Sequence, residues 1–139
     1  MTGAILERYQ RLKHEIAELA RTAGRVPDAV RLVAASKTQP PETLEPLIHA
    51  GLTDFGENTA QEALPKIERL RAHPLTWHFI GHLQSNKAKM VDRLCELVHS
   101  LDTDSAARRL TVPALLEVNL GGEASKSGVG EDEIEGYLQ

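Results

Sequence analysis

Residues 32–38, Leu-Val-Ala-Ala-Ser-Lys-Thr, form a short apolar run that ends in a lysine. Small and β-branched residues in this arrangement predict a strand over residues 31–36 that is buried on both faces, as in a parallel sheet. Burial disfavours the charged form of a lysine, so Lys37 at the tip of such a strand is suited to form a Schiff base with an aldehyde. The alternative is a lysine whose aliphatic stem lies along the protein and whose ammonium stays in water.

The rest of the chain alternates between strand and helix patterns. An amphipathic helix opens the chain and ends near Gly24, and Thr59 and Glu62 have the spacing of a helix capping box. Alternation at this spacing predicts βαβ units and a parallel sheet, either an open doubly wound sheet or a TIM-type barrel. Further strands are expected at residues 53–55, 77–81, 97–101 and 114–119, and helices at residues 41–50, 60–72, 86–95, 105–110 and from about 131.

Length and composition predict one domain that spans residues 1–139. The formal net charge of −4 argues against a nucleic-acid-binding protein, which needs a basic face. The single cysteine, Cys95, cannot form an internal disulfide and fits a reducing compartment. No apolar stretch reaches membrane-spanning length, and charged residues interrupt the N-terminal apolar positions, so we expect a cytoplasmic protein without a signal peptide or membrane contact.

Polar residues follow each predicted strand. In both α/β architectures ligands bind at the carboxyl ends of parallel strands, so the sequence predicts a shared polar mouth. The residues expected there are Lys37, Glu57, Asn58, Gly81, His82, Asp102 and Asn119.

Other motifs point to less specific chemistry. His78 and His82 are four residues apart, but they flank a predicted strand end rather than sharing a helix face, so no metal site is expected. Lys126 lies between two serines in a glycine-containing loop, which is either an anion contact or a solvated turn. The sequence contains no nucleotide-binding glycine motif and no nucleophile elbow.

Several of these stretches together resemble one known family. They are A-S-K-T at residues 35–38, F-G-E-N at 55–58, W-H-F-I-G-H-L-Q-S-N-K at 77–87, V-N at 118–119 and S-K-S-G at 125–128. In this order they resemble the pyridoxal phosphate homeostasis protein family, and the third stretch alone is long and unusual.

The resemblance implies a (β/α)8 TIM-type barrel related to the N-terminal domain of alanine racemase. It implies pyridoxal 5'-phosphate bound to Lys37 as a Schiff base, with Asn58, His82, Asn119 and Lys126 in the cofactor site. It also implies a protein without catalysis that binds, buffers and delivers the cofactor, with cofactor-requiring apo-enzymes as partners.

The chain departs from the family in length. A full barrel takes roughly 200 residues or more, so we expect a barrel truncated after about five strands, with a short connection at residues 102–113 and an unpaired sheet edge open to oligomerisation. The phosphate-binding groups of the family come mostly from its last strands, so weak cofactor binding is expected. A racemase-like enzyme and a fragment that no longer holds the cofactor are the alternative functions.

Overall fold

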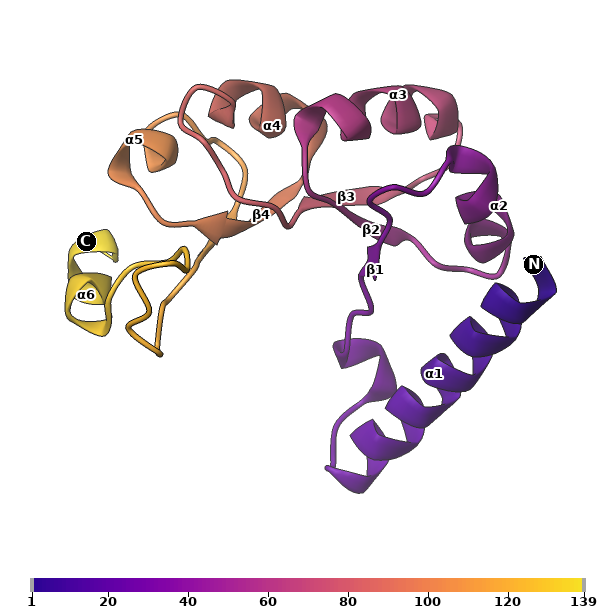
Figure 1. Ribbon diagram of the computed structural model, residues 1–139. Coiled ribbons are helices and arrows are strands. Elements are labelled where there is room, and N and C mark those ends of the chain that lie inside the picture. The colour runs from indigo at the N-terminus through magenta and orange to yellow at the C-terminus, as the bar shows by residue number, and fades with distance from the viewer. Residues whose placement is uncertain (1, 139) are drawn as a thin grey trace.

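The structure, a computed structural model, describes residues 2–138 as a curved parallel sheet with helices outside it (Figure 1). Each strand pairs in parallel with its successor, in the order β1-β2-β3-β4-β5. This sequential order is that of a barrel, because a doubly wound sheet reverses its strand order at a switch point. The strands are β1 (Ala34–Ala35), β2 (Asp54–Glu57), β3 (Thr76–Phe79), β4 (Leu97–Leu101) and β5 (Ala114–Leu116).

A helix connects each strand to the next and covers the convex side of the sheet (Figure 1). The alternation predicted from the sequence is therefore confirmed, with most boundaries shifted by a few residues. The connecting helices are α2 (Pro41–His49), α3 (Ala60–Leu70), α4 (Ala88–Leu94) and α5 (Asp104–Ala107). The short connection after β4 thus still makes a crossover, with a helix of 4 residues.

The core lies between the sheet and these helices. Phe55, Trp77 and Val98 from three neighbouring strands pack in one cluster with helix residues such as Leu70 and Val91. Because side chains alternate along a strand, the residues between them face the other, concave side of the sheet. The contacts of His78 described below lie on the concave side, whereas Glu57, on the same face of β2 as Phe55, contacts Lys66 of α3 on the helix side.

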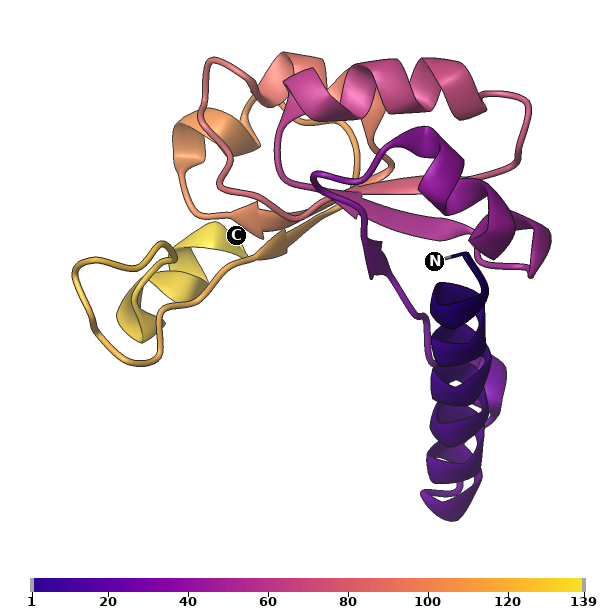
Figure 2. The same ribbon diagram turned by 45° about the vertical axis from the view of Figure 1, so that its right-hand side comes forward.

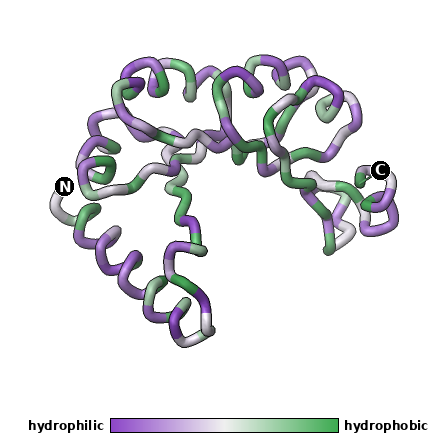
Figure 3. Tube along the Cα trace, turned by 180° about the vertical axis from the view of Figure 1, so that it is seen from behind, coloured by the Kyte–Doolittle hydropathy of each residue, from purple (hydrophilic) through white to green (hydrophobic). Residues whose placement is uncertain are grey.

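The N-terminal helix α1 (Thr2–Thr22) stands apart from the sheet. Figure 2 shows its first turns near α2 and the rest running away, while Figure 3 shows hydrophobic and hydrophilic residues alternating along it. Ile5 and Tyr9 pack against the core, and Gly24, with φ +69°, follows the end of the helix as predicted. A 3-10 turn, η1 (Pro27–Ala29), leads back toward β1.

After β5 the chain forms a loop and two short helical segments, η2 (Glu131–Glu133) and α6 (Ile134–Tyr137). The loop is closed by a bridge between Val118 and Val129. No helix within residues 2–138 is long and apolar enough to cross a membrane.

The first strand differs from its prediction. Only Ala34 and Ala35 are in strand conformation, and they are half-buried and exposed rather than buried on both faces. The reason is position: among the described residues β1 has one neighbour, β2, and its concave face is open. β2, which has two neighbours, is buried along its whole length.

Candidate functional site

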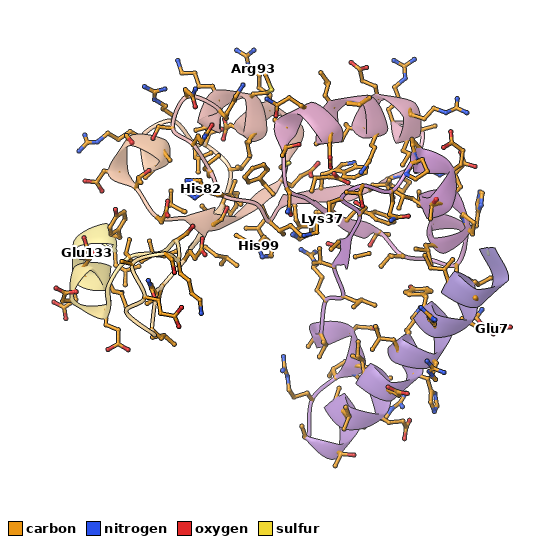
Figure 4. The ribbon with its side chains drawn as sticks, in the orientation of Figure 1. Glu7, Lys37, His82, Arg93, His99 and Glu133 are labelled. Carbon is orange, nitrogen blue, oxygen red and sulfur yellow. The ribbon has the colours of Figure 1, made fainter. Side chains whose placement is uncertain are left out.

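Lys37 follows β1 at the carboxyl edge of the sheet, on the concave side (Figure 4). Its side chain is exposed, so the expectation that burial desolvates this lysine is wrong. The next residue, Thr38, has φ +62°, a left-handed conformation that is uncommon for a β-branched residue. Such local strain persists only where surrounding contacts hold it. The backbone at Lys37 and Thr38 is therefore held in one conformation by its neighbours.

A buried ion pair fixes the backbone immediately before Lys37. Nζ of Lys66 donates to the carbonyl oxygen of Ser36 at 2.6 Å and lies 2.7 Å from Oε1 of Glu57. The Ser36 hydroxyl donates to the same Oε1 at 2.6 Å. All three residues are at least nine-tenths buried, and Oε2 of Glu57 has no partner among the described residues.

The backbone after Lys37 is held from the same helix, α3. Thr59 caps α3, because its hydroxyl accepts from the backbone N–H of Glu62 at 3.2 Å. The reciprocal half of the predicted capping box is absent: the Glu62 carboxylate instead accepts from the backbone N–H of Thr38 at 3.4 Å. Residues on both sides of Lys37 are therefore tied to α3.

Three further side chains form a polar chain on the concave side. Nε2 of His78 lies 2.8 Å from Oδ1 of Asp54, and Nδ1 of His78 lies 2.8 Å from Nε2 of His99. His78 is fully buried. Burial, and then the charge of His78, lower the pKa of His99 below its ordinary value of 6.5.

His82 lies in a second cluster, next to the loop after β5. Its Nδ1 is 3.4 Å from the Ser127 hydroxyl and 3.9 Å from Oδ2 of Asp102. Oδ2 also accepts from the backbone N–H of Gly128 at 3.3 Å, while Oδ1 is buried without a partner in the described part of the chain. Because His78 and His82 contact different partners, they do not converge on one point.

Asn119 and Lys126 belong to the same loop. The Asn119 amide donates to the backbone carbonyl oxygens of Glu123 at 2.9 Å and of Lys126 at 3.5 Å, so it holds the loop together. The Lys126 side chain is exposed and pairs with the Glu123 carboxylate at 3.3 Å. In this structure both residues shape the loop rather than contact Lys37.

Asn58 and His82 share a hollow of about 370 Å³ at the carboxyl edge. Gly81 lies so close to the Asn58 backbone that an added Cβ would come within 2.1 Å of the Asn58 carbonyl oxygen. Among the described residues that line the hollow there is no carboxylate, and the polar ones include Gln61, Gln84 and Lys87. Such a donor-rich lining suits an anionic group.

The sequence interpretation missed Lys66 and the pairing of His78 with His99. Lys66 lies on the buried face of α3 together with Ala63 and Leu70. A lysine at a buried helix position indicates a buried partner for its charge. His78 alternates with two core aromatics, which places it on the opposite face of β3. Its partners could not be identified without the register between strands.

The chain is similar to curated proteins along almost its whole length. It is 43% identical over 141 residues to the pyridoxal phosphate homeostasis protein of Pseudomonas aeruginosa and 39% identical over 137 residues to that of Aquifex aeolicus. This chain belongs to the pyridoxal phosphate homeostasis protein family. No family model matches it. The two matches cover 95% and 92% of this chain but 61% and 60% of the relatives, so this family member spans about three fifths of their length.

Solved structures agree with the family assignment. PipY of Synechococcus elongatus, solved with pyridoxal phosphate bound, is 34% identical and superposes with a TM-score of 0.74, over 88% of this chain and 62% of PipY. An unknown protein from Bifidobacterium adolescentis is 32% identical with a TM-score of 0.82, over 96% of this chain and 62% of that one. The curved parallel sheet with its connecting helices is therefore a fold shared with these relatives.

Proposed function

We propose that this chain binds pyridoxal 5'-phosphate through Lys37 and acts without catalysis, in homeostasis or delivery of the cofactor. One observation carries the proposal: an exposed lysine at the carboxyl end of β1, with the backbone on either side tied to α3, in a chain of this family. Cofactor-requiring apo-enzymes of the cytoplasm are the partners that such a role implies.

The residues present fit the reactive end of the cofactor. When bound, the cofactor supplies an aldehyde, and an amine that attacks it releases its oxygen as water. Lys37 supplies that amine on the open concave side. The bonds between α3 and the backbone of Ser36 and Thr38 hold the Lys37 backbone in place.

The hollow at Asn58 and His82 fits the anionic end. It offers amide, imidazole and ammonium donors and no carboxylate among the described lining residues. We assign Asn58 and His82 to this contact, with Lys126 and the loop held by Asn119 closing over it from the β5 side. His82 and Lys126 are both exposed, so water competes for their N–H donors and we expect the affinity to be weak.

The role without catalysis rests on the chemistry of racemisation. A racemase needs two acid–base groups on opposite faces of the substrate α-carbon. Lys37 is one candidate, whereas His82 and Asp102 lie in a separate cluster at the β5 side. We therefore favour binding over a racemase-like enzyme.

Absorbance titration with pyridoxal phosphate tests the proposal. We expect a saturable spectral change in the unaltered chain that is lost in Lys37→Ala and kept in Lys89→Ala, a matched change at an exposed lysine of α4. Equal signals in both variants would identify the chain as one that no longer holds the cofactor at Lys37. Conversion of an added L-amino acid to its D form, dependent on Lys37, would select the racemase-like enzyme instead.

A further inference from the structure

Lys37 lies in a tight turn that runs from Ser36 to Gln39. The backbone N–H of Gln39 donates to the Ser36 carbonyl oxygen at 3.1 Å, so Lys37 and Thr38 are the two central residues of the turn. Thr38, with φ +62°, is the single non-glycine residue with a positive φ among residues 2–138. Turns that need a positive φ at this position normally have glycine or asparagine there, because a Cβ is unfavourable. The β-branched Thr38 therefore keeps a strained conformation that its contacts must maintain.

One side of α3 holds this turn on both sides of Lys37. Glu62 and Lys66 are four residues apart on the helix, which places them one above the other on the same face. The Lys66 ammonium donates to the Ser36 carbonyl oxygen at 2.6 Å, and the Glu62 carboxylate accepts from the Thr38 N–H at 3.4 Å. The two peptide groups that flank Lys37 are thus both held by α3, while the Lys37 side chain itself is exposed.

The held turn places Lys37 beside Asn58. The Ser36 N–H donates to the Gly56 carbonyl oxygen at 2.9 Å, and the Ser36 hydroxyl donates to the Glu57 carboxylate at 2.6 Å, so the end of β1 is bonded to the end of β2. Lys37 and Asn58 are the residues that follow on these two neighbouring strands, and Asn58 lines the hollow assigned above to the anionic end of the cofactor. The Lys37 backbone is therefore fixed next to that hollow.

We propose that Glu62 is a positioning residue for Lys37, acting through Thr38, and that it favours attachment of aldehydes that carry an anionic group. A ligand whose anionic end occupies the hollow meets the Lys37 amine as an intramolecular partner, and the effective concentration of that amine depends on how firmly its backbone is held. The amine nitrogen bonds to the aldehyde carbon, and the aldehyde oxygen leaves as water with two amine protons. An aldehyde without the anionic group has no anchor in the hollow and gains nothing from the fixed backbone. This role of Glu62 rests on the proposed function of Lys37.

Two variants of Glu62 separate its contact with Thr38 from its charge. A carboxylate repels an anionic ligand, so removal of the charge alone would strengthen binding rather than weaken it. Glu62→Gln removes the charge but keeps an acceptor oxygen for the Thr38 N–H, whereas Glu62→Ala removes both. The Thr59 hydroxyl accepts from the backbone N–H of residue 62, so both variants keep this cap of α3. Each expected effect is therefore a difference between Glu62→Ala and Glu62→Gln.

Amide hydrogen exchange measured by NMR tests the contact in the free protein. The Thr38 N–H should exchange about fivefold faster in Glu62→Ala than in Glu62→Gln, as for the loss of one ordinary hydrogen bond. Glu68→Ala, at an exposed position of the same helix, should leave this rate unchanged. Thr38→Gly should raise the urea midpoint of unfolding, because glycine adopts φ +62° without strain. Equal exchange in the two Glu62 variants, or a lower midpoint in Thr38→Gly, would overturn the proposed positioning.

Attachment of two aldehydes tests what the positioning serves. Each Glu62 variant is mixed with pyridoxal phosphate or with pyridoxal, which lacks the phosphate, and the label at Lys37 is trapped with borohydride and quantified by peptide mass mapping. Attachment of pyridoxal phosphate should be about fivefold slower in Glu62→Ala than in Glu62→Gln, the lower end of the cost of ordering one backbone residue, whereas attachment of pyridoxal should be equally fast in both.

The failures of the two proposals are distinguishable. Equal rates with pyridoxal phosphate in the two Glu62 variants, or the same loss with both aldehydes, would overturn the role of Glu62 while Lys37 of the unaltered chain still takes the cofactor. If Lys37 of the unaltered chain takes neither aldehyde, the proposed function itself fails, and the role of Glu62 in it fails with it.

Discussion

Replacement of Lys66 by methionine is the most demanding test of how the Lys37 backbone is held. Lys66 is 7% exposed and its ammonium contacts both the Ser36 carbonyl oxygen and the fully buried Glu57 carboxylate. In Lys66→Met the Ser36 hydroxyl is the one donor to that carboxylate that remains among residues 2–138. Loss of one partner from a buried pair costs about 3–5 kcal/mol, so we expect the free energy of unfolding to fall by that amount.

A double variant separates the charge from the packing. Lys66→Met combined with Glu57→Met removes both charges, while the Ser36 carbonyl oxygen still accepts from the backbone N–H of Gln39 at 3.1 Å. The double variant should thus be no less stable than Lys66→Met alone. Urea unfolding followed by fluorescence of Trp77, the single tryptophan and 5% exposed, measures both. Lys89→Met, at an exposed position of α4, is the control; a cost for Lys66→Met no larger than for this control would refute the reasoning.

Three further predictions follow from single side chains. Because the pKa of His99 is lowered, the folded state resists its protonation, so stability should be constant above about pH 6.5 and fall as the pH decreases below that value. His99→Gln should flatten this part of a Tm-against-pH curve. A curve that His99→Gln leaves unchanged would contradict the lowered pKa of His99. Burial raises the pKa of Cys95 to about 12, so a thiol reagent at pH 8 should label it only after urea unfolding, and labelling of the folded chain would be inconsistent with the structure. Gly81→Ala would place a methyl group within 2.1 Å of the Asn58 carbonyl oxygen, so it should lower the free energy of unfolding by roughly 1–3 kcal/mol in the same urea assay, whereas Gly136→Ala, with open space around it, should not.

Much of the architecture was predictable from local patterns. Alternating strand and helix segments, and polar residues such as Asn58 and His82 after successive strands, follow from periodicity that the sequence displays directly. The burial of Lys37 was not predictable in this way. Whether a strand is buried on both faces depends on what lies across the sheet, and β1 has an open concave face.

The polar contacts of the site were the least accessible to sequence reasoning. His78 and His99 are 21 residues apart, as are Ser36 and Glu57, and each pair meets only through the register of parallel strands. From residue type alone, His78 had to be considered as a metal ligand. Its geometry instead gives it Asp54 and His99 as partners. Register, rather than composition, decides the chemistry of the concave face.

The account turns on whether Lys37 is the residue that holds the cofactor. Borohydride reduction of the chain mixed with an equimolar amount of pyridoxal phosphate, followed by peptide mass mapping, measures this directly. The account predicts one added cofactor per chain, concentrated at Lys37 and absent from the exposed lysines Lys89 and Lys126. Label spread evenly over these lysines, or undiminished in Lys37→Ala, would contradict it.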